Sequence, residues 1–212
     1  MNTLKLLIGT CCLMTILCSC DKVADASEQG SAHDQEIVFK EEVEQALLKW
    51  TPKKIRNGKA KKLKASFFTE QDLTDPRLGV EGGNCEDQSY PFFNVQKGEG
   101  NANVLGKFKT EITFCAKPPA EGDLTVDYKG GQGTFYTEAG HELHIEIPTG
   151  VVKLISPPSE FQAAFQDRFI ITGGTGPYKS ASGVGMTDSF VKFKPEGGDR
   201  TQHTWYAFVI LD

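Results

Sequence analysis

Short segments with alternating apolar and polar residues, separated by glycines and prolines, constrain the fold of this chain most strongly. The segments 103–115 (NVLGKFKTEITFC), 123–128 (DLTVDY) and 141–147 (HELHIEI) each carry apolar side chains at every second position. A period of two is typical of β-strands that bury one face. Short strands at regular spacing with Gly and Pro turns predict an all-β sandwich or barrel.

The last such segment, 203–211 (HTWYAFVIL), is apolar on both faces. Trp205 and Val209 share one face, and Tyr206 and Phe208 share the other. A strand of this kind is covered on both sides. The outer cover is either the N-terminal segment of this chain or a partner subunit in a homo-oligomer, and the sequence leaves both open.

Residues 1–19 have the pattern of a secretory signal peptide. Lys5 supplies a positive charge, and the apolar run that follows is too short to span a bilayer comfortably. The end of the run, Leu17-Cys18-Ser19-Cys20, resembles a bacterial lipobox. This resemblance implies cleavage before Cys20, a lipid on Cys20, attachment to a membrane and a place in the bacterial cell envelope, at the outer membrane or the periplasmic face of the inner one. The alternative is an ordinary signal peptide or a membrane anchor.

The remaining chain divides into three parts. Residues 20–35 are small and polar, which predicts a flexible tether. Residues 36–52 predict an amphipathic helix, because Phe39, Val43, Leu47 and Trp50 recur at helical spacing and Pro52 stops it. Residues 53–212 form the predicted β-barrel domain.

Cysteine usage and charge narrow the function classes. Cys85 and Cys115 are the two of six cysteines that lie beyond Cys20. Outside the cytoplasm such a pair favours a disulfide, with two buried thiols as the alternative. The formal net charge is −5, and the basic run 53–64 has no interleaved aromatic residues. We therefore expect no nucleic-acid partner.

The segment 173–185, GGTGPYKSASGVG, holds five glycines. A dinucleotide-binding loop needs a third glycine where Lys179 stands, so we expect no phosphate site. A turn followed by a strand fits better. Gly173, Gly174 and Gly176 are expected to take positive φ values, and the bare face of Gly183 and Gly185 is expected to admit a backbone or a large aromatic ring.

The stretch FIITGGTGPYKSASGVG resembles the GGTG-aromatic signature of the allene oxide cyclase-like barrel superfamily, which includes dirigent proteins; Tyr178 stands at the aromatic position. The segments 98–115 and 133–147 are similar to strands of exported bacterial members. The resemblance implies a small antiparallel β-barrel of about eight strands, here with one N-terminal helix, and frequent oligomers. The catalytic glutamate of the cyclases has no counterpart that can be matched here, so no catalytic residue is predicted.

An eight-stranded barrel has room for one small ligand. Aromatic and histidine side chains that alternation places on apolar faces are the predicted ligand-binding residues: Phe108, Phe114, His141, His203 and Tyr206. The row Glu142, His144 and Glu146 is assigned to the wet outer face. No nucleophile motif, metal-ligand spacing or cofactor motif is present, so no metal and no cofactor is expected.

Three functions remain open at this point. The first is a lipid-anchored barrel that binds a small hydrophobic molecule or a partner without catalysis. The second is an isomerase, a cyclase or a dirigent-like enzyme. The third is a structural envelope lipoprotein. A dry aromatic cavity favours the first, an ionisable group in an open cavity the second, and a filled interior the third.

Overall fold

The computed structural model describes residues 60–79, 84–117, 119–155, 160–194 and 197–211. The predicted signal peptide, Cys20, the tether and the segment 36–52 lie outside these ranges, so they stay predictions. Among the described residues, no helix has the length and apolar character needed to cross a bilayer.

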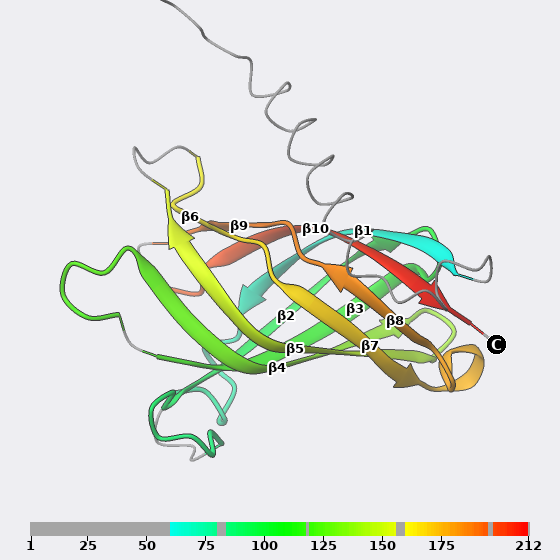
Figure 1. The fold of residues 1–212 in the computed structure, drawn as a ribbon, viewed down its shortest axis with the longest axis horizontal. Helices are drawn as coiled ribbons and strands as arrows, with labels where there is room; N and C mark the ends of the chain where they lie inside the picture. Colours follow the sequence, from blue (N-terminus) through cyan, green and yellow to red (C-terminus); the bar gives the residue numbers. More distant parts are fainter. Residues whose placement is uncertain (1–59, 80–83, 118, 156–159, 195–196, 212) are drawn as a thin grey trace, which may run out of the picture.

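The described chain is almost entirely β-structure (Figure 1). In chain order the strands are β1 (Lys61–Gln71), β2 (Phe92–Ala102), β3 (Gly106–Ala116), β4 (Thr125–Thr137), β5 (Glu142–Leu154), β6 (Ala163–Phe165), β7 (Arg168–Gly174), β8 (Ser182–Met186), β9 (Ser189–Lys192) and β10 (Arg200–Ile210). One short 3-10 turn, η1 (Gly176–Tyr178), lies between β7 and β8. The expectation of an all-β fold is confirmed.

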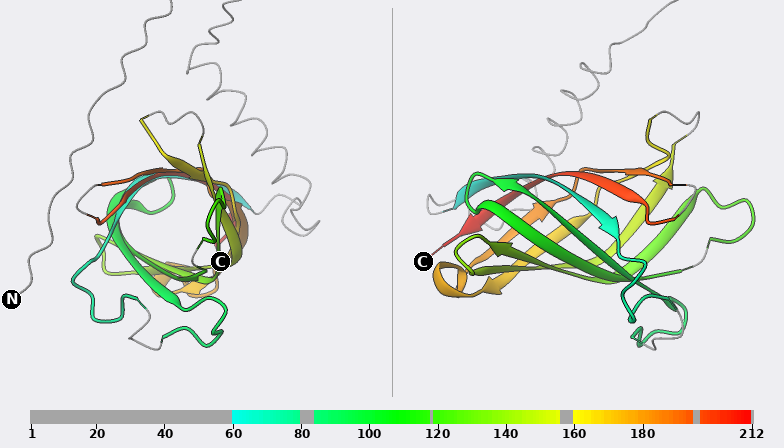
Figure 2. Two further views of the ribbon diagram at one scale, coloured as in Figure 1. Left: turned by 90° about the vertical axis from the view of Figure 1, so that its left-hand side faces the viewer. Right: turned by 180° about the vertical axis from the view of Figure 1, so that it is seen from behind.

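The strands close into an antiparallel barrel. β1 to β5 pair in sequence order, and β1 also pairs with β10. β6 and β7 both pair with β5, and β8 and β9 both pair with β10, so each couple acts as one interrupted strand. The closed barrel therefore has eight strands, as expected, and Figure 2 shows the ring end on.

The two interruptions lie next to each other and stabilise each other. The backbone N–H of Thr187 donates to the carbonyl of Asp167 at 2.8 Å. In return, the N–H of Asp167 donates to the Thr187 hydroxyl at 2.7 Å. The backbone N–H groups of Asp167 and Thr187 lie outside the regular strand pairing, and these two hydrogen bonds satisfy them. The barrel wall can therefore bend at the two interruptions.

Aromatic rings fill one half of the barrel. Phe67 packs edge to face on Phe108, Phe135 and Trp205, with ring centroids 5.0–5.7 Å apart. These rings and Phe169 are buried. The alternation of β5 is confirmed, because Leu143, Ile145 and Ile147 are buried while Glu142, His144 and Glu146 are not.

The glycine-rich segment closes the end of this packed half. After β7 the chain turns through η1, and Tyr178 is buried with its hydroxyl donating to the carbonyl of Val104 at 3.3 Å. Gly173 and Gly176 have positive φ values of 136° and 55°, as expected. The same expectation for Gly174 is wrong. A Cβ there would lie 2.0 Å from the carbonyl oxygen of Glu142, so close strand packing is the reason for this glycine.

The glycines of β8 make room for neighbours, as expected. A Cβ on Gly185 would lie 2.1 Å from Cζ of Phe169, its cross-strand partner. A Cβ on Gly183 would lie 2.2 Å from the carbonyl oxygen of Phe208. The Phe169 ring therefore occupies the space that any side chain at position 185 would need.

A disulfide joins Cys85 to Cys115 with an S–S distance of 2.08 Å, which confirms the expected pair. Cys85 lies in the β1–β2 connection and Cys115 near the end of β3. The connection is also held by an ion pair between Asp87 and Lys129 of β4. Closing a loop of this length stabilises a fold by roughly 3–4 kcal/mol.

We predict that Gly185→Ala lowers the free energy of unfolding by about 1–3 kcal/mol, because the added methyl group displaces the Phe169 ring. Phe169→Leu removes the obstacle, so the double variant should lose less stability than the sum of the two single variants. Denaturant unfolding of all four proteins measures this coupling. Additive losses would show that the ring and the glycine do not share one space.

Candidate functional site

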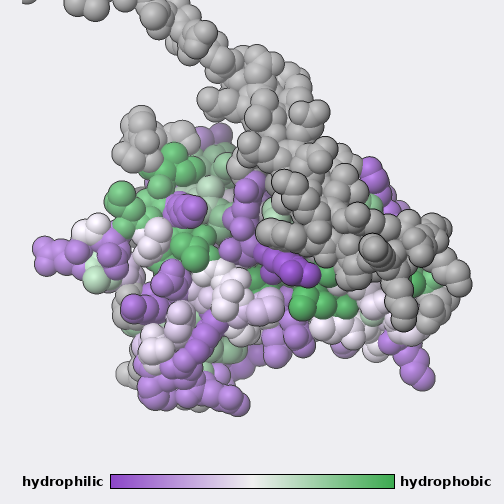
Figure 3. All heavy atoms as spheres, viewed as in Figure 1, coloured by the Kyte–Doolittle hydropathy of each residue, from purple (hydrophilic) through white to green (hydrophobic). Residues whose placement is uncertain are grey.

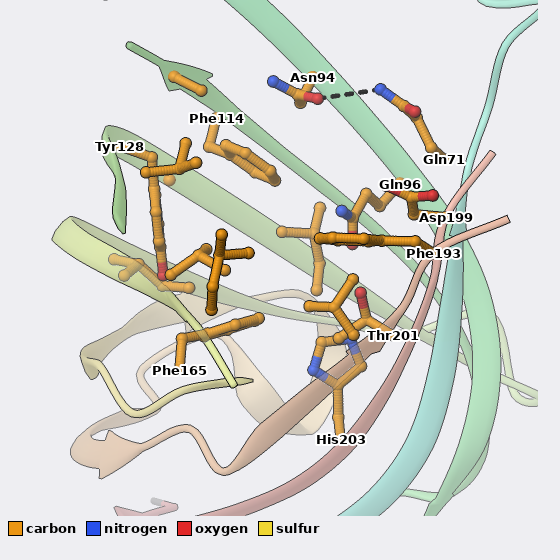
Figure 4. Close-up of a pocket in the computed structure, with 18 of the residues that line it drawn as sticks. Gln71, Asn94, Gln96, Phe114, Tyr128, Phe165, Phe193, Asp199, Thr201 and His203 are labelled. Carbon is orange, nitrogen blue, oxygen red and sulfur yellow. Dashed lines mark hydrogen bonds between the residues drawn. The ribbon is translucent and has the colours of Figure 1, made fainter. Parts of the chain in front are cut away.

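The other half of the barrel holds a cavity of about 190 Å³ (Figure 4). Eight strands, β1 to β6, β9 and β10, contribute to its wall. The lining is mainly apolar and consists of Gln71, Asn94, Gln96, Ile112, Phe114, Ala116, Val126, Tyr128, Gly131, Ile147, Val152, Leu154, Phe165, Val191, Phe193, Asp199, Thr201, His203 and Trp205. The cavity lies at the end of the barrel opposite to η1.

Aromatic rings form one wall and the floor. The Phe114 and Tyr128 rings are 5.0 Å apart, and Phe165 packs edge to face on Tyr128 at 6.2 Å. Trp205, which belongs to the packed half, closes the bottom. Such a wall favours a molecule with an apolar surface.

A directed chain of hydrogen bonds runs along the opposite wall. Trp205 Nε1 donates to the Ser189 hydroxyl at 3.1 Å, and that hydroxyl lies 2.8 Å from His203 Nδ1. His203 Nε2 lies 2.9 Å from the Thr69 hydroxyl, which donates to Gln96 Oε1 at 2.7 Å. Because Thr69 uses its proton on Gln96, His203 must donate to it from Nε2 and accept from Ser189 at Nδ1.

Burial keeps His203 neutral. Removal from water lowers the pKa of His203 to about 3. The ring is stacked on Phe67 with a centroid distance of 4.4 Å, and both of its nitrogens have partners. His203 therefore has no free lone pair for proton abstraction. Its role is to fix the direction of donation in the hydrogen bonds that run from Trp205 to Gln96.

The chain of hydrogen bonds ends at the Gln96 amide, whose N–H group faces the cavity. Gln96 lines the cavity, and its Oε1 accepts from Thr69. Within the described part of the chain, its Nε2 has no hydrogen-bond partner. Gln71 and Asn94 stand on the same side, joined by a hydrogen bond of 3.0 Å (Figure 4). The cavity thus offers an apolar wall and, facing it, an amide N–H donor.

Tyr128 and Asp167 form a second polar pair. The Tyr128 hydroxyl donates to Asp167 Oδ2 at 2.7 Å, and the N–H of Val151 donates to Oδ1 at 3.1 Å. Burial raises the pKa of Asp167 and, together with the Asp167 charge, raises that of Tyr128 further above its usual range. The pair anchors the aromatic wall at the break between β6 and β7.

Two of the five predicted ligand-binding residues, Phe114 and His203, line the cavity. The other three do not. Phe108 is part of the packed core. His141 lies at the closed end, with its Nδ1 2.4 Å from the position of a Cβ on Gly176. Tyr206 faces outward, because its neighbour Trp205 takes the inward position, and the ammonium of Lys64 lies 5.8 Å from its ring centroid.

Sequence reasoning missed Gln96, Tyr128 and Phe165 as wall residues. Tyr128 was detectable, since alternation of 123–128 placed it on the apolar face. Gln96 carried no such signal, because a polar residue next to Lys97 in a segment without clean alternation predicts an exposed position. Phe165 lies in a strand of three residues, which is too short for a periodicity.

Two further observations concern the outer face of β5 and groups of possible metal ligands. His144 Nε2 lies 2.8 Å from Glu142 Oε2 on the outside of β5, as expected for a solvated face. In the residues that the structure describes, no group of three or more His, Cys, Asp or Glu side chains could hold a metal ion.

Comparisons with known proteins give one structural likeness to report. No protein-family model matches the chain, and no curated protein matches its sequence. A solved structure of the pterocarpan synthase dirigent protein GePTS1 is similar at 16% identity and a TM-score of 0.38, over 72% of this chain and 86% of that one. We transfer no activity and no residue role from a likeness of this size.

We predict that His203 makes the fold sensitive to mild acid. The unfolded histidine has a pKa near 6.5 and the folded one about 3. Between these values the unfolded chain binds more protons, so stability is complete above about pH 6.5 and falls as the pH drops, by up to about 1.4 kcal/mol per pH unit. Denaturant unfolding at steps from pH 7.5 to pH 5 measures the slope.

The variant His203→Gln removes this titration. We expect it to be less stable than the wild type at pH 7.5, because hydrogen bonds are lost, but to lack the wild-type decline toward pH 5. The difference between the two proteins isolates His203 from the carboxylates, which titrate in both. An equal decline in both proteins would show that another group causes it.

Proposed function

We propose that this protein binds one small, mainly apolar molecule inside the open half of the barrel. The observation that carries the proposal is the cavity itself, an aromatic and aliphatic space of about 190 Å³ next to a fully packed half. Apolar cavities of about 150 Å³ hold a benzene ring. The size therefore suits a molecule with one ring, smaller than most drug-like ligands.

The polar groups support a ligand with one hydrogen-bond acceptor. Gln96 Nε2 is the donor that the hydrogen-bond chain leaves for the cavity, and His203 and Thr69 fix its direction. Covering this donor with a molecule that accepts no hydrogen bond would cost free energy. A carbonyl or ether oxygen at this place would satisfy it, whereas a hydrocarbon of equal shape would not.

Binding without catalysis is supported by the state of the ionisable groups. His203 is neutral with both nitrogens in use, and the Tyr128 hydroxyl already donates its hydrogen bond to Asp167. The alternative is an isomerase, a cyclase or a dirigent-like enzyme that acts on a hydrophobic substrate in the barrel. The raised pKa of Asp167, which accepts a hydrogen bond from Tyr128 of the cavity wall, is the observation that favours this alternative.

We predict that acetophenone, a ring with one carbonyl, binds to the purified chain and that isopropylbenzene, its hydrocarbon analogue, binds more weakly. Val126→Trp fills the cavity from an inward position on β4 and should weaken acetophenone binding at least about tenfold, or roughly 1.4 kcal/mol. Thr125→Trp adds the same side chain on the exposed outer face and is the matched control. Calorimetry measures all four cases.

Equal binding by both tryptophan variants would place the ligand elsewhere. Native mass spectrometry of the protein from cells, followed by organic extraction, identifies a bound molecule and the subunit number, which also tests the predicted homo-oligomer. A ligand released chemically changed from the form added would favour the enzyme. Loss of turnover with retained binding in Asp167→Asn would then assign proton transfer to Asp167.

We further propose that the chain is exported and lipidated on Cys20, as the lipobox resemblance implies. In a bacterial host, labelled palmitate should enter the wild-type protein and not the Cys20→Ala variant. Fractionation of inner and outer membranes then tells which envelope membrane holds the protein. Absence of label from the wild type would contradict lipidation at Cys20.

A further inference from the structure

Exposed apolar side chains surround the open end of the cavity. Seven large apolar side chains of the described residues are exposed, and five of them lie at this end: Leu73, Phe92, Leu124, Leu154 and Phe193. We call these five residues the rim. Leu124 is 64% exposed, the highest value in the set. The other two, Tyr136 and Ile170, lie away from the cavity mouth.

The rim continues the inner face of the barrel. Leu124 precedes Val126 and Tyr128 in the inward register of β4, and Phe92 precedes Asn94 and Gln96 in that of β2. Leu154 pairs with Leu124 through a backbone hydrogen bond of 2.9 Å. Side chains on one face of a strand alternate with the other face. These residues therefore extend the cavity wall to the ends of the strands, where Phe92 and Leu154 belong to the last backbone pairs.

Two side chains join the rim to the cavity. Leu154 and Phe193 are exposed, and both also line the cavity. Figure 3 shows apolar side chains gathered toward this end of the molecule. An apolar ligand that leaves the cavity into water loses its contact with apolar surroundings. If an apolar phase lies against the rim, the ligand keeps such contact as it leaves.

We propose that the rim docks onto a lipid bilayer and that the cavity exchanges its ligand with the hydrocarbon phase. The docking stands on the rim alone, and the exchange step rests on the proposed function. Exposed apolar side chains at the level of lipid headgroups bind by burial of their surface. The ligand class is then a small molecule that partitions into membranes.

The shape of the rim favours a fluid phase over a protein partner. Its side chains come from several strand ends around a closed ring, and a closed barrel offers no strand edge for an added peptide. A second copy placed mouth to mouth would block the cavity. A bilayer adapts to a ring of separate side chains and leaves the mouth in contact with an apolar phase.

The charged side chains near the open end of the barrel are of both signs. Lys117 and Lys153 stand beside Glu121 and Asp123 near the same strand ends. A surface of mixed charge does not select anionic lipids. Docking is therefore driven by apolar contact, and it occurs on neutral lipids and does not depend on salt.

The test uses the chain from Asp21 to Asp212, which lacks any lipid and contains every described strand, the core and the disulfide. Flotation with neutral phosphatidylcholine vesicles measures the fraction of bound protein. We expect binding by the wild type and a fall of at least about tenfold in Leu73→Ser/Leu124→Ser, because two side chains no longer bury apolar surface. The double variant Tyr136→Ser/Ile170→Ser removes two exposed apolar side chains elsewhere and should float like the wild type.

Each outcome decides the proposal. Equal flotation of the two double variants overturns it, and so does binding that requires anionic lipid or disappears in high salt. A change of subunit number in Leu73→Ser/Leu124→Ser by native mass spectrometry also overturns it, since the rim would then join two copies. Selective loss of flotation in the rim variant, with unchanged subunit number, supports it.

The experiments distinguish a failure of ligand binding in the cavity from a failure of membrane docking by the rim. Leu73 and Leu124 do not line the cavity, so the rim variant should still bind acetophenone, while Val126→Trp should still float. Loss of vesicle binding with intact acetophenone binding would leave the cavity function standing. Failure of acetophenone binding with intact flotation would leave only the docking surface.

Discussion

The pairing of β1 with β10 is the constraint on which the rest of the structure depends. It runs without a break from Lys61 opposite Val209 to Glu70 opposite Arg200 and joins the first described strand to the last. Closure removes the sheet edges and fixes the interior volume. Once that volume is fixed, the size of each inward side chain decides whether a given level of the barrel is filled or hollow.

The two halves of the barrel follow from this rule. At the closed end, Phe67, Phe108 and Phe135 meet one another across the axis, and Tyr178 covers them. Toward the open end the inward positions carry smaller or shorter groups, such as Ala116, Val126 and Val152, and the aromatic rings stand at the wall. The result is a cavity whose floor is the packed aromatic core, and the side chains of its wall are supported by that core.

Buried polar groups give the cavity its orientation. The path from Trp205 through Ser189, His203 and Thr69 satisfies every buried donor in turn and leaves one amide donor at the ligand space. Partly satisfied networks are costly, so a complete one defines a single arrangement. The same network explains why His203 serves the orientation of the Gln96 amide and the stability of the fold, whereas the apolar side chains of the rim take no part in it.

The sequence by itself determined the alternating strands within 103–115, 123–128, 141–147 and 203–211 and the turn of the glycine-rich segment, and it favoured the cysteine pair. The strands and the turn depend on alternation and on local backbone freedom, both of which are visible in short segments. The tertiary structure alone decided which inward residues meet. Thr69 and His203 are 134 residues apart and touch only because the β1–β10 register places Phe67 opposite His203. Gly174 shows the same limit, because only the position of Glu142 on the next strand explains it. The cavity, its donor and its rim depend on such long-range pairings, which no local pattern contains.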